Sequence, residues 1–202
     1  MGDDVAILFS RRPCVSAGMF TRSRFEGPSV TISRPRAAAG EARAIVVVAK
    51  NANVATGDQG FRDALELTEL VGAGTGIPVD QVLVASTGVI GRPYPMPLLR
   101  EHLANLQGAG WDAGAEGVAR AIMTTDTVPK TASRDAGGAR VVGIAKGVGM
   151  IEPHLATMLA FVLTDAAVDT ATLDRIWRRA VDDTFNCLSV DTDTSTSDTA
   201  VI

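Results

Sequence analysis

The sequence has few aromatic residues, which make up only 4% of its 202 positions. A core with so few rings must be built mainly from valine, leucine, isoleucine and alanine. Hydrophobic residues account for 46% of the chain and charged residues for 21%, a balance typical of globular domains. No internal repeat or low-complexity linker divides the chain, so we predict one domain over residues 1–202.

Cysteine is also scarce, since only Cys14 and Cys187 occur, far apart. Their spacing fits neither a metal site nor a disulfide framework, and we predict free thiols in a reducing cytoplasm and no metal or cofactor. The start, MGDDVAILFS, carries acids where a signal peptide needs bases, and no apolar run approaches membrane-spanning length. A net charge of −4 argues against nucleic acid or a membrane surface as a partner.

Apolar patterning predicts the helices and strands. The predicted strands are Val5–Phe9, 15–20, 29–33, 44–49, 82–85, 141–145, 158–163, 187–190 and 199–202. The predicted helices run between Asp58 and Gly72, over 97–106 and 117–123, and after an Asp169 N-cap. Gly72, Gly74 and Gly76 follow a helix rather than a strand, so we interpret them as helix termination and not as a nucleotide loop. Strands first, then strands alternating with helices, predict a layered α/β sandwich with a mixed sheet.

The stretch KGVGMIEPHLATMLAFVLT, residues 146–164, combines a glycine-punctuated turn with a buried apolar strand. Thr157 lies where the turn meets the strand. A threonine at a strand start is usually structural. It becomes a candidate nucleophile only together with the rest of the chain.

Five segments supply that support: KNANVATG (50–57), STGVIG (86–91), IMTTDTVPK (122–130), AKGVGMIEPHLATMLAFVLTDA (145–166) and DTDTSTSDTA (191–200). In this order they resemble the ornithine acetyltransferase family, also called glutamate N-acetyltransferases, of arginine biosynthesis. HLATML and TSTSDTAV look similar to members associated with clavulanic acid biosynthesis. The resemblance implies a fold similar to N-terminal-nucleophile hydrolases and an α2β2 heterotetramer.

The family resemblance also implies autocatalytic cleavage between Ala156 and Thr157, giving an α-chain-like segment 1–156 and a β-chain-like segment that starts at 157. By the same resemblance Thr157 is the catalytic nucleophile, Thr87 and Gly88 form the oxyanion site, and Thr124, Lys146 and Thr157 bind substrate. A freed Thr157 α-amine, with a pKa of about 7.7–8, is a suitable base for its own hydroxyl. The implied reaction is ping-pong acetyl transfer from N-acetylornithine to glutamate.

The sequence departs from the family in length, because family members are nearly twice as long. The missing half would supply an acidic substrate-binding residue and a C-terminal asparagine and hydroxyl pair. We therefore expect an incomplete domain, with TAVI (199–202) as the opening of a strand. The chain is then either a fragment, or it is completed by a second chain that supplies the missing half. Two alternatives stay open: a truncated non-catalytic remnant or interaction protein, and a self-processing aminopeptidase of similar design.

Overall fold

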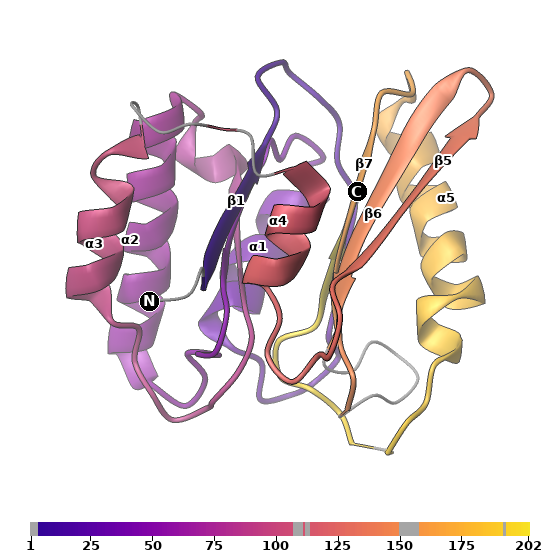
Figure 1. Ribbon diagram of the computed structural model, residues 1–202. Helices are drawn as coiled ribbons and strands as arrows, with labels where there is room; N and C mark the ends of the chain where they lie inside the picture. The colour runs from indigo at the N-terminus through magenta and orange to yellow at the C-terminus, as the bar shows by residue number, and fades with distance from the viewer. Residues whose placement is uncertain (1–3, 107–110, 112–113, 150–157, 192) are drawn as a thin grey trace.

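Two mixed β-sheets carry the fold, and helices cover their faces (Figure 1). The computed structural model describes residues 4–106, 111, 114–149, 158–191 and 193–202. The helices and strands are β1 (Val5–Phe9), β2 (Gly18–Phe20), α1 (Pro28–Ala38), β3 (Ala44–Val48), α2 (Gly57–Thr75), β4 (Val82–Ser86), α3 (Met96–Leu103), α4 (Gly114–Ala121), β5 (Lys130–Ala136), β6 (Ala139–Lys146), β7 (Leu159–Thr164), α5 (Thr170–Asp183) and β8 (Thr199–Val201), with short 3₁₀ turns at Val79–Gln81 and Phe185–Cys187.

One sheet has the strand order β1-β3-β4 and the other the order β2-β8-β7-β6-β5. Both are mixed, since β3 pairs with β4 and β7 with β8 in parallel while the other neighbours are antiparallel. The predicted layered α/β class with a mixed sheet is therefore confirmed. None of the described helices is long and apolar enough to cross a membrane.

Three apolar cores bind the layers together. In the first, α2 and α3 pack on the outer face of the three-stranded sheet, where Leu67 meets Val46. In the second, α1 and α4 lie between the two sheets, in a cluster that includes Val47 and Phe161. In the third, α5 covers the outer face of the other sheet through Trp177. Adjacent β3 residues Val46 and Val47 thus serve different cores, because successive strand side chains point to opposite faces.

This double burial explains why the apolar runs at 44–49 and 82–85 predicted strands correctly. All five residues of β3 and of β4 are buried. A strand covered on both faces typically has a continuous run of valine, isoleucine and leucine in its sequence. The predictions for Val5–Phe9, 141–145, 158–163 and 199–202 are also confirmed, apart from one or two residues at their ends, although β1 and β6 are only partly buried.

The strand predicted at 29–33 is wrong, because this segment lies inside helix α1. Pro28 occupies the first turn of the helix, where its fixed φ is favourable. The Ser33 hydroxyl donates to the Val84 carbonyl over 2.7 Å and accepts from the Val84 N–H over 2.8 Å. Tertiary contacts with β4 therefore override a weak alternation of two apolar residues.

The strand predicted at 187–190 is also wrong. Phe185–Cys187 forms a 3₁₀ turn after α5, and Leu188 and Val190 are 47% and 61% exposed. Conversely, β5 was not predicted, because its sequence KTASRDA has no apolar alternation and its side chains are largely exposed. At 15–20 only Gly18–Phe20 forms a strand.

The helix ends follow local chemistry. The Asp169 carboxylate accepts the Thr172 N–H over 2.9 Å and caps α5 as predicted. In α2 the predicted Asp58 cap and Gly72 end are wrong: the helix starts at Gly57 and ends only at Gly76, whose φ is 73°. Gly74 stays inside the helix where a Cβ would meet the Leu106 side chain at 2.6 Å.

Candidate active site

The turn that follows β4 presents a backbone donor beside a hydroxyl. The N–H groups of Thr87 and Val89 donate to the carbonyls of Val48 and Lys50, over 3.0 and 3.3 Å. Between them, the Gly88 N–H has no acceptor among the described residues. Gly88 has a φ of 130°, and a Cβ there would lie 2.2 Å from the Lys50 carbonyl carbon. Only glycine fits this close approach. Because its N–H has no acceptor among the described residues, the Gly88 amide is available to a ligand.

Lys146 brings two of the predicted site residues together from distant parts of the chain. Its Nζ donates to the Thr87 hydroxyl over 2.9 Å and to the Thr124 hydroxyl over 3.0 Å. Lys146 ends β6 and is only 2% exposed, so it is not the surface lysine that a lone lysine in a sequence usually is. A buried ammonium held by two hydroxyls retains a third donor for an anion.

The electrostatics around Lys146 favour such an anion. Burial lowers the pKa of the Lys146 ammonium, and the carboxyls of Asp126 and Asp198 oppose that effect. A cation removed from water interacts more strongly with a negative charge, because the surrounding medium is less polarisable. The Lys146 ammonium is thus suited to a carboxylate or to charge that develops during a reaction.

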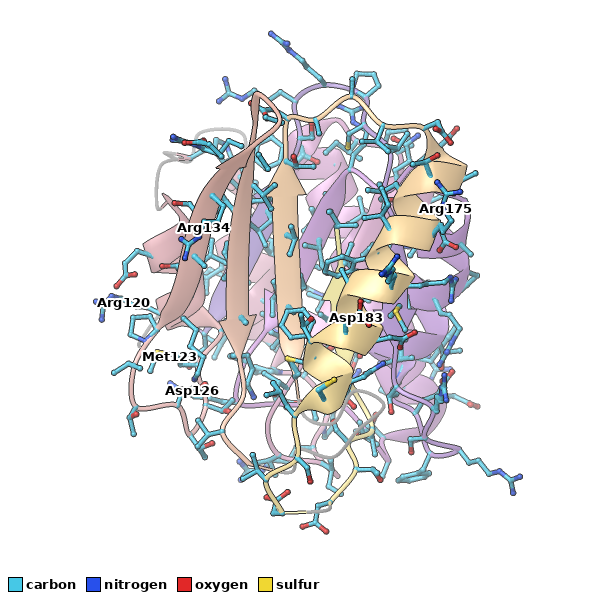
Figure 2. All side chains as sticks on the ribbon, turned by 90° about the vertical axis from the view of Figure 1, so that its right-hand side faces the viewer. Arg120, Met123, Asp126, Arg134, Arg175 and Asp183 are labelled. Atoms are coloured by element: carbon cyan, nitrogen blue, oxygen red, sulfur yellow. The ribbon has the colours of Figure 1, made fainter. Side chains whose placement is uncertain are left out.

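Asp126 holds the turn around this cluster. Its Oδ1 accepts the Gly147 N–H over 2.8 Å and forms an ion pair with Lys130. Burial raises the pKa of Asp126, but Lys130 and the N–H groups of Gly147 and Thr124 lower it by more, so the net pKa lies below its usual value. In Figure 2 Asp126 lies toward the lower end of the sheet, below Arg134 of β5. The charged carboxylate ties Thr124 and Gly147, which precede and follow the β5–β6 hairpin, into one unit.

A second buried carboxyl group, that of Asp198, holds the start of β7. Asp198 is fully buried, and its Oδ1 accepts the Met158 N–H over 2.8 Å. Burial raises the pKa of Asp198 to about 8, although the Met158 amide favours the charged form. Leu159 pairs with Lys146 in the β6–β7 register, so β7 begins beside the Lys146 cluster.

The predicted nucleophile Thr157 and the cleavage position at Ala156 lie outside the described residues, which resume at Met158. The division into segments 1–156 and 157–202 stays a prediction. The structure brings Thr87, Gly88, Thr124 and Lys146 together at the end of β6 next to which β7 starts. No group of three or more metal-ligating side chains gathers anywhere in the described part of the chain.

Sequence reasoning did not single out Asp126 or Asp198. Both stand inside the quoted segments IMTTDTVPK and DTDTSTSDTA, where acids and hydroxyl residues alternate. The available signal is a carboxyl group in a short run rich in hydroxyl residues, which for Asp198 stands next to the predicted strand 199–202. Such a run more often forms a solvated loop, and only the fold shows that these two carboxyls are buried.

Comparison with known proteins decides the family. A model of the ArgJ family matches residues 2–202. The chain belongs to the ArgJ family. Glutamate N-acetyltransferase Oat2 of Streptomyces clavuligerus is 54% identical over 200 residues, which cover 99% of this chain and 51% of that protein. The arginine biosynthesis bifunctional protein ArgJ of Rhodococcoides fascians is 53% identical, with 99% and 49% covered. The chain therefore spans about half the length of the curated ArgJ relatives it matches.

Solved structures of the family have the same fold. ArgJ from Bacillus halodurans aligns with a TM-score of 0.64 at 30% identity, covering 77% of this chain and 83% of that chain. Ornithine acetyltransferase from Mycobacterium tuberculosis, complexed with ornithine, aligns with a TM-score of 0.63 at 30% identity, covering 74% and 82%. An aminopeptidase from Ochrobactrum anthropi, described as a variant of the Ntn hydrolase fold, aligns with a TM-score of 0.50 at 12% identity, covering 98% and 64%. The last likeness concerns fold alone, and it agrees with the predicted N-terminal-nucleophile-like architecture.

Proposed function

We propose that this chain supplies the nucleophile, the oxyanion donors and part of the substrate pocket of a glutamate N-acetyltransferase. The reaction moves an acetyl group from N-acetylornithine to glutamate. The observation that carries this proposal is the buried contact of Lys146 with the hydroxyls of Thr87 and Thr124, in a chain of the ArgJ family.

The first step is cleavage between Ala156 and Thr157. The Thr157 hydroxyl attacks the Ala156 carbonyl carbon, and the peptide nitrogen leaves as the Thr157 α-amine. Water then hydrolyses the resulting ester, which leaves a carboxylate on Ala156 and restores the Thr157 hydroxyl.

Acetyl transfer follows in two half-reactions at the same hydroxyl. The Thr157 Oγ attacks the acetyl carbon of N-acetylornithine while its proton passes to the α-amine. The α-amine then gives that proton to the departing ornithine nitrogen. The amine of glutamate attacks the acetyl-threonine ester, forms N-acetylglutamate and restores the hydroxyl. An α-amine with an unperturbed pKa of about 7.7–8 can accept and release a proton near neutral pH.

Each half-reaction passes through a tetrahedral oxyanion, for which the Thr87–Gly88 turn is suited. The Thr87 oxygen already accepts from Lys146, so its own hydrogen is free to donate to an oxyanion. The unpaired Gly88 N–H is a second donor, and the nearby ammonium of Lys146 polarises both. Loss of one oxyanion donor typically costs about 2.7–4 kcal/mol of barrier.

Thr124 and Lys146 serve substrate binding in this proposal. The remaining Lys146 donor suits the α-carboxylate that both ornithine and glutamate carry, and the Mycobacterium tuberculosis relative is complexed with ornithine. We further propose an α2β2 assembly with the polypeptide that corresponds to the other half of the relatives.

The test is intact mass spectrometry of the chain, co-expressed with the uncovered half of the Streptomyces clavuligerus relative. Two fragments that meet at Ala156 and Thr157 are expected, and the Thr157→Ala variant should stay uncut. Cleaved protein should transfer acetyl from N-acetylornithine to glutamate, and Lys146→Met should lower kcat/KM at least 100-fold. Lys130→Met is the matched control, because it removes a partly exposed lysine from the same cluster. An uncut chain without transfer activity in the presence of that half overturns the proposal.

A further inference from the structure

A large apolar groove runs along the outer edge of β1. Its volume is about 1180 Å³, which exceeds the roughly 300–1,000 Å³ typical of small-molecule pockets. Apolar side chains of α3, α4, β6 and β7 line it together with β1 itself, among them Leu98, Val118, Ile144 and Leu163. Figure 1 shows β1 between the α2–α3 pair on one side and α4 on the other. The groove therefore opens on both faces of a single strand.

About half of the backbone N–H and C=O groups of β1 point away from β3, toward this edge. The Ser10 N–H donates to the Arg43 carbonyl and the Ala49 N–H to the Asp4 carbonyl, each over 2.8 Å. Hydrogen-bonded pairs alternate in antiparallel strands, so the even-numbered residues of β1 bond to β3. The N–H and C=O groups of Val5, Ile7 and Phe9 point the other way, and no strand in the described part of the chain pairs with that edge.

This edge also lacks the features that keep a free strand from associating. Natural edge strands are usually interrupted by charges, proline or bulges. Val5–Phe9 is VAILF, with neither a charge nor a proline. Beside it, Leu98 and Leu163 are 37% and 45% exposed, unusually so for leucines that line a groove. The edge and its flanks together form a template for another strand and its apolar side chains.

The relatives indicate what covers this template. Their identity to this chain extends over 99% of it but over only about half of their own length. The relatives therefore carry a further segment about as long as this chain. An apolar groove of about 1180 Å³ that runs along an unpaired strand edge suits such a polypeptide.

We infer that the β1 groove is the docking surface for the polypeptide that corresponds to the second half of the ArgJ relatives, which adds a strand antiparallel or parallel to β1. Its apolar side chains contact α3 on one face and α4, β6 and β7 on the other. The groove reaches Lys50 and Asn51, whose backbone packs on Gly88. The docked strand thus ends beside the oxyanion turn. This inference rests on the assembly with the other half that is proposed above, and it does not depend on the proposed acetyl transfer.

The test uses the Thr157→Ala chain, so that binding is measured apart from cleavage. The partner is the half of the Streptomyces clavuligerus Oat2 protein that this chain does not cover, co-expressed with a separate tag. A one-to-one complex is expected by size-exclusion chromatography with light scattering. Leu98→Glu and Leu163→Glu should each raise the Kd at least tenfold. Ile176→Glu is the matched control on α5, where a 52% exposed apolar residue lies outside the groove.

Hydrogen exchange gives a second readout that a misfolded variant cannot imitate. In the complex, exchange of the Ile7 amide should slow at least tenfold, while the Leu8 amide, which already bonds to β3, changes little. Absence of a complex, or a complex that Leu98→Glu and Leu163→Glu leave unchanged, overturns the inference. So does a homodimer of this chain alone that both variants disrupt, because a second copy is then the occupant.

Discussion

The edge strands β1 and β5 differ in the polarity of their side chains and of the surface beside them. β5 is KTASRDA, with charged and hydroxyl side chains that are mostly exposed, and Arg134 extends from it in Figure 2. β1 is VAILF, flanked by an apolar groove. Charges on an edge strand oppose strand addition, and an apolar edge invites it. The two edges therefore differ in how readily each would accept a further strand.

The largest expected effect comes from placing the same carboxylate in each edge strand. Ala6 of β1 is buried against α4, so Ala6→Asp buries an unpaired charge and should lower the free energy of unfolding by at least about 2 kcal/mol. Ala132 of β5 is exposed, and Ala132→Asp should cost less than about 1 kcal/mol. Urea denaturation followed by tryptophan fluorescence measures both. Equal losses would contradict the contrast between the edges.

The next effect concerns the start of β5, where the edge reaches the candidate site. Asp126→Ala leaves the Gly147 N–H and Lys130 without their acceptor and should cost about 1–3 kcal/mol. Lys130→Met, which removes the partly exposed partner, should cost less than about 1 kcal/mol. Because the folded pKa of Asp126 is lowered, its contribution is present above its unfolded pKa of about 3.9 and is lost as the pH falls further. A flat acid profile in the parent chain would argue against this ion pair.

A pH effect of opposite sign is expected from Asp198, in the interior of the same sheet. Its folded pKa is about 8, well above the value of about 3.9 expected for the unfolded chain. The folded state holds the extra proton between these values, so the contribution of Asp198 to stability should be fully present below about pH 4 and fall as the pH rises from about 4 to about 8. Asp198→Asn should remove this slope while still accepting the Met158 N–H. An unchanged slope in the variant would assign the effect to another group.

The smallest effect on stability should come from making β5 resemble β1. Replacing Arg134 and Asp135 together by valine should change the free energy of unfolding by less than about 1 kcal/mol, because both side chains are exposed. Self-association should nevertheless rise, measured by sedimentation velocity. The matched control replaces Asp174 and Arg178, an exposed ion pair on α5, by valine. Both replacements leave the net charge unchanged, so association in both variants alike would indicate that loss of exposed charged side chains in general, and not the strand edge, promotes it.

Strands buried on both faces were predictable from the sequence, because short continuous apolar runs rich in β-branched residues, such as AIVVVA, seldom form another kind of element. The 29–33 segment was not, since the Ser33 contact that fixes it as a helix comes from Val84, 51 residues away. β5 escaped prediction for the reverse reason. Its stability comes from pairing with β6, and its own side chains face water.

The candidate site shows the same limit. Family motifs identified Thr87, Thr124 and Lys146, but their meeting depends on contacts 59 and 22 residues apart in the chain. Asp126 and Asp198 acquire their roles only through burial, which no local pattern reports. Sequence motifs therefore identified candidate site residues, and the fold adds the carboxyls that hold the turns around them.

The opposite edge of the three-stranded sheet has a further consequence. There the Ser33 hydroxyl satisfies both the N–H and the C=O of Val84, and the Arg36 guanidinium donates to the Val82 carbonyl over 2.6 Å. Helix α1 thus imitates a neighbouring strand and terminates the sheet at β4. A further strand can therefore be added to this sheet only beside β1. The β4 edge is fixed by α1, so the number of strands in the sheet depends on the β1 edge alone.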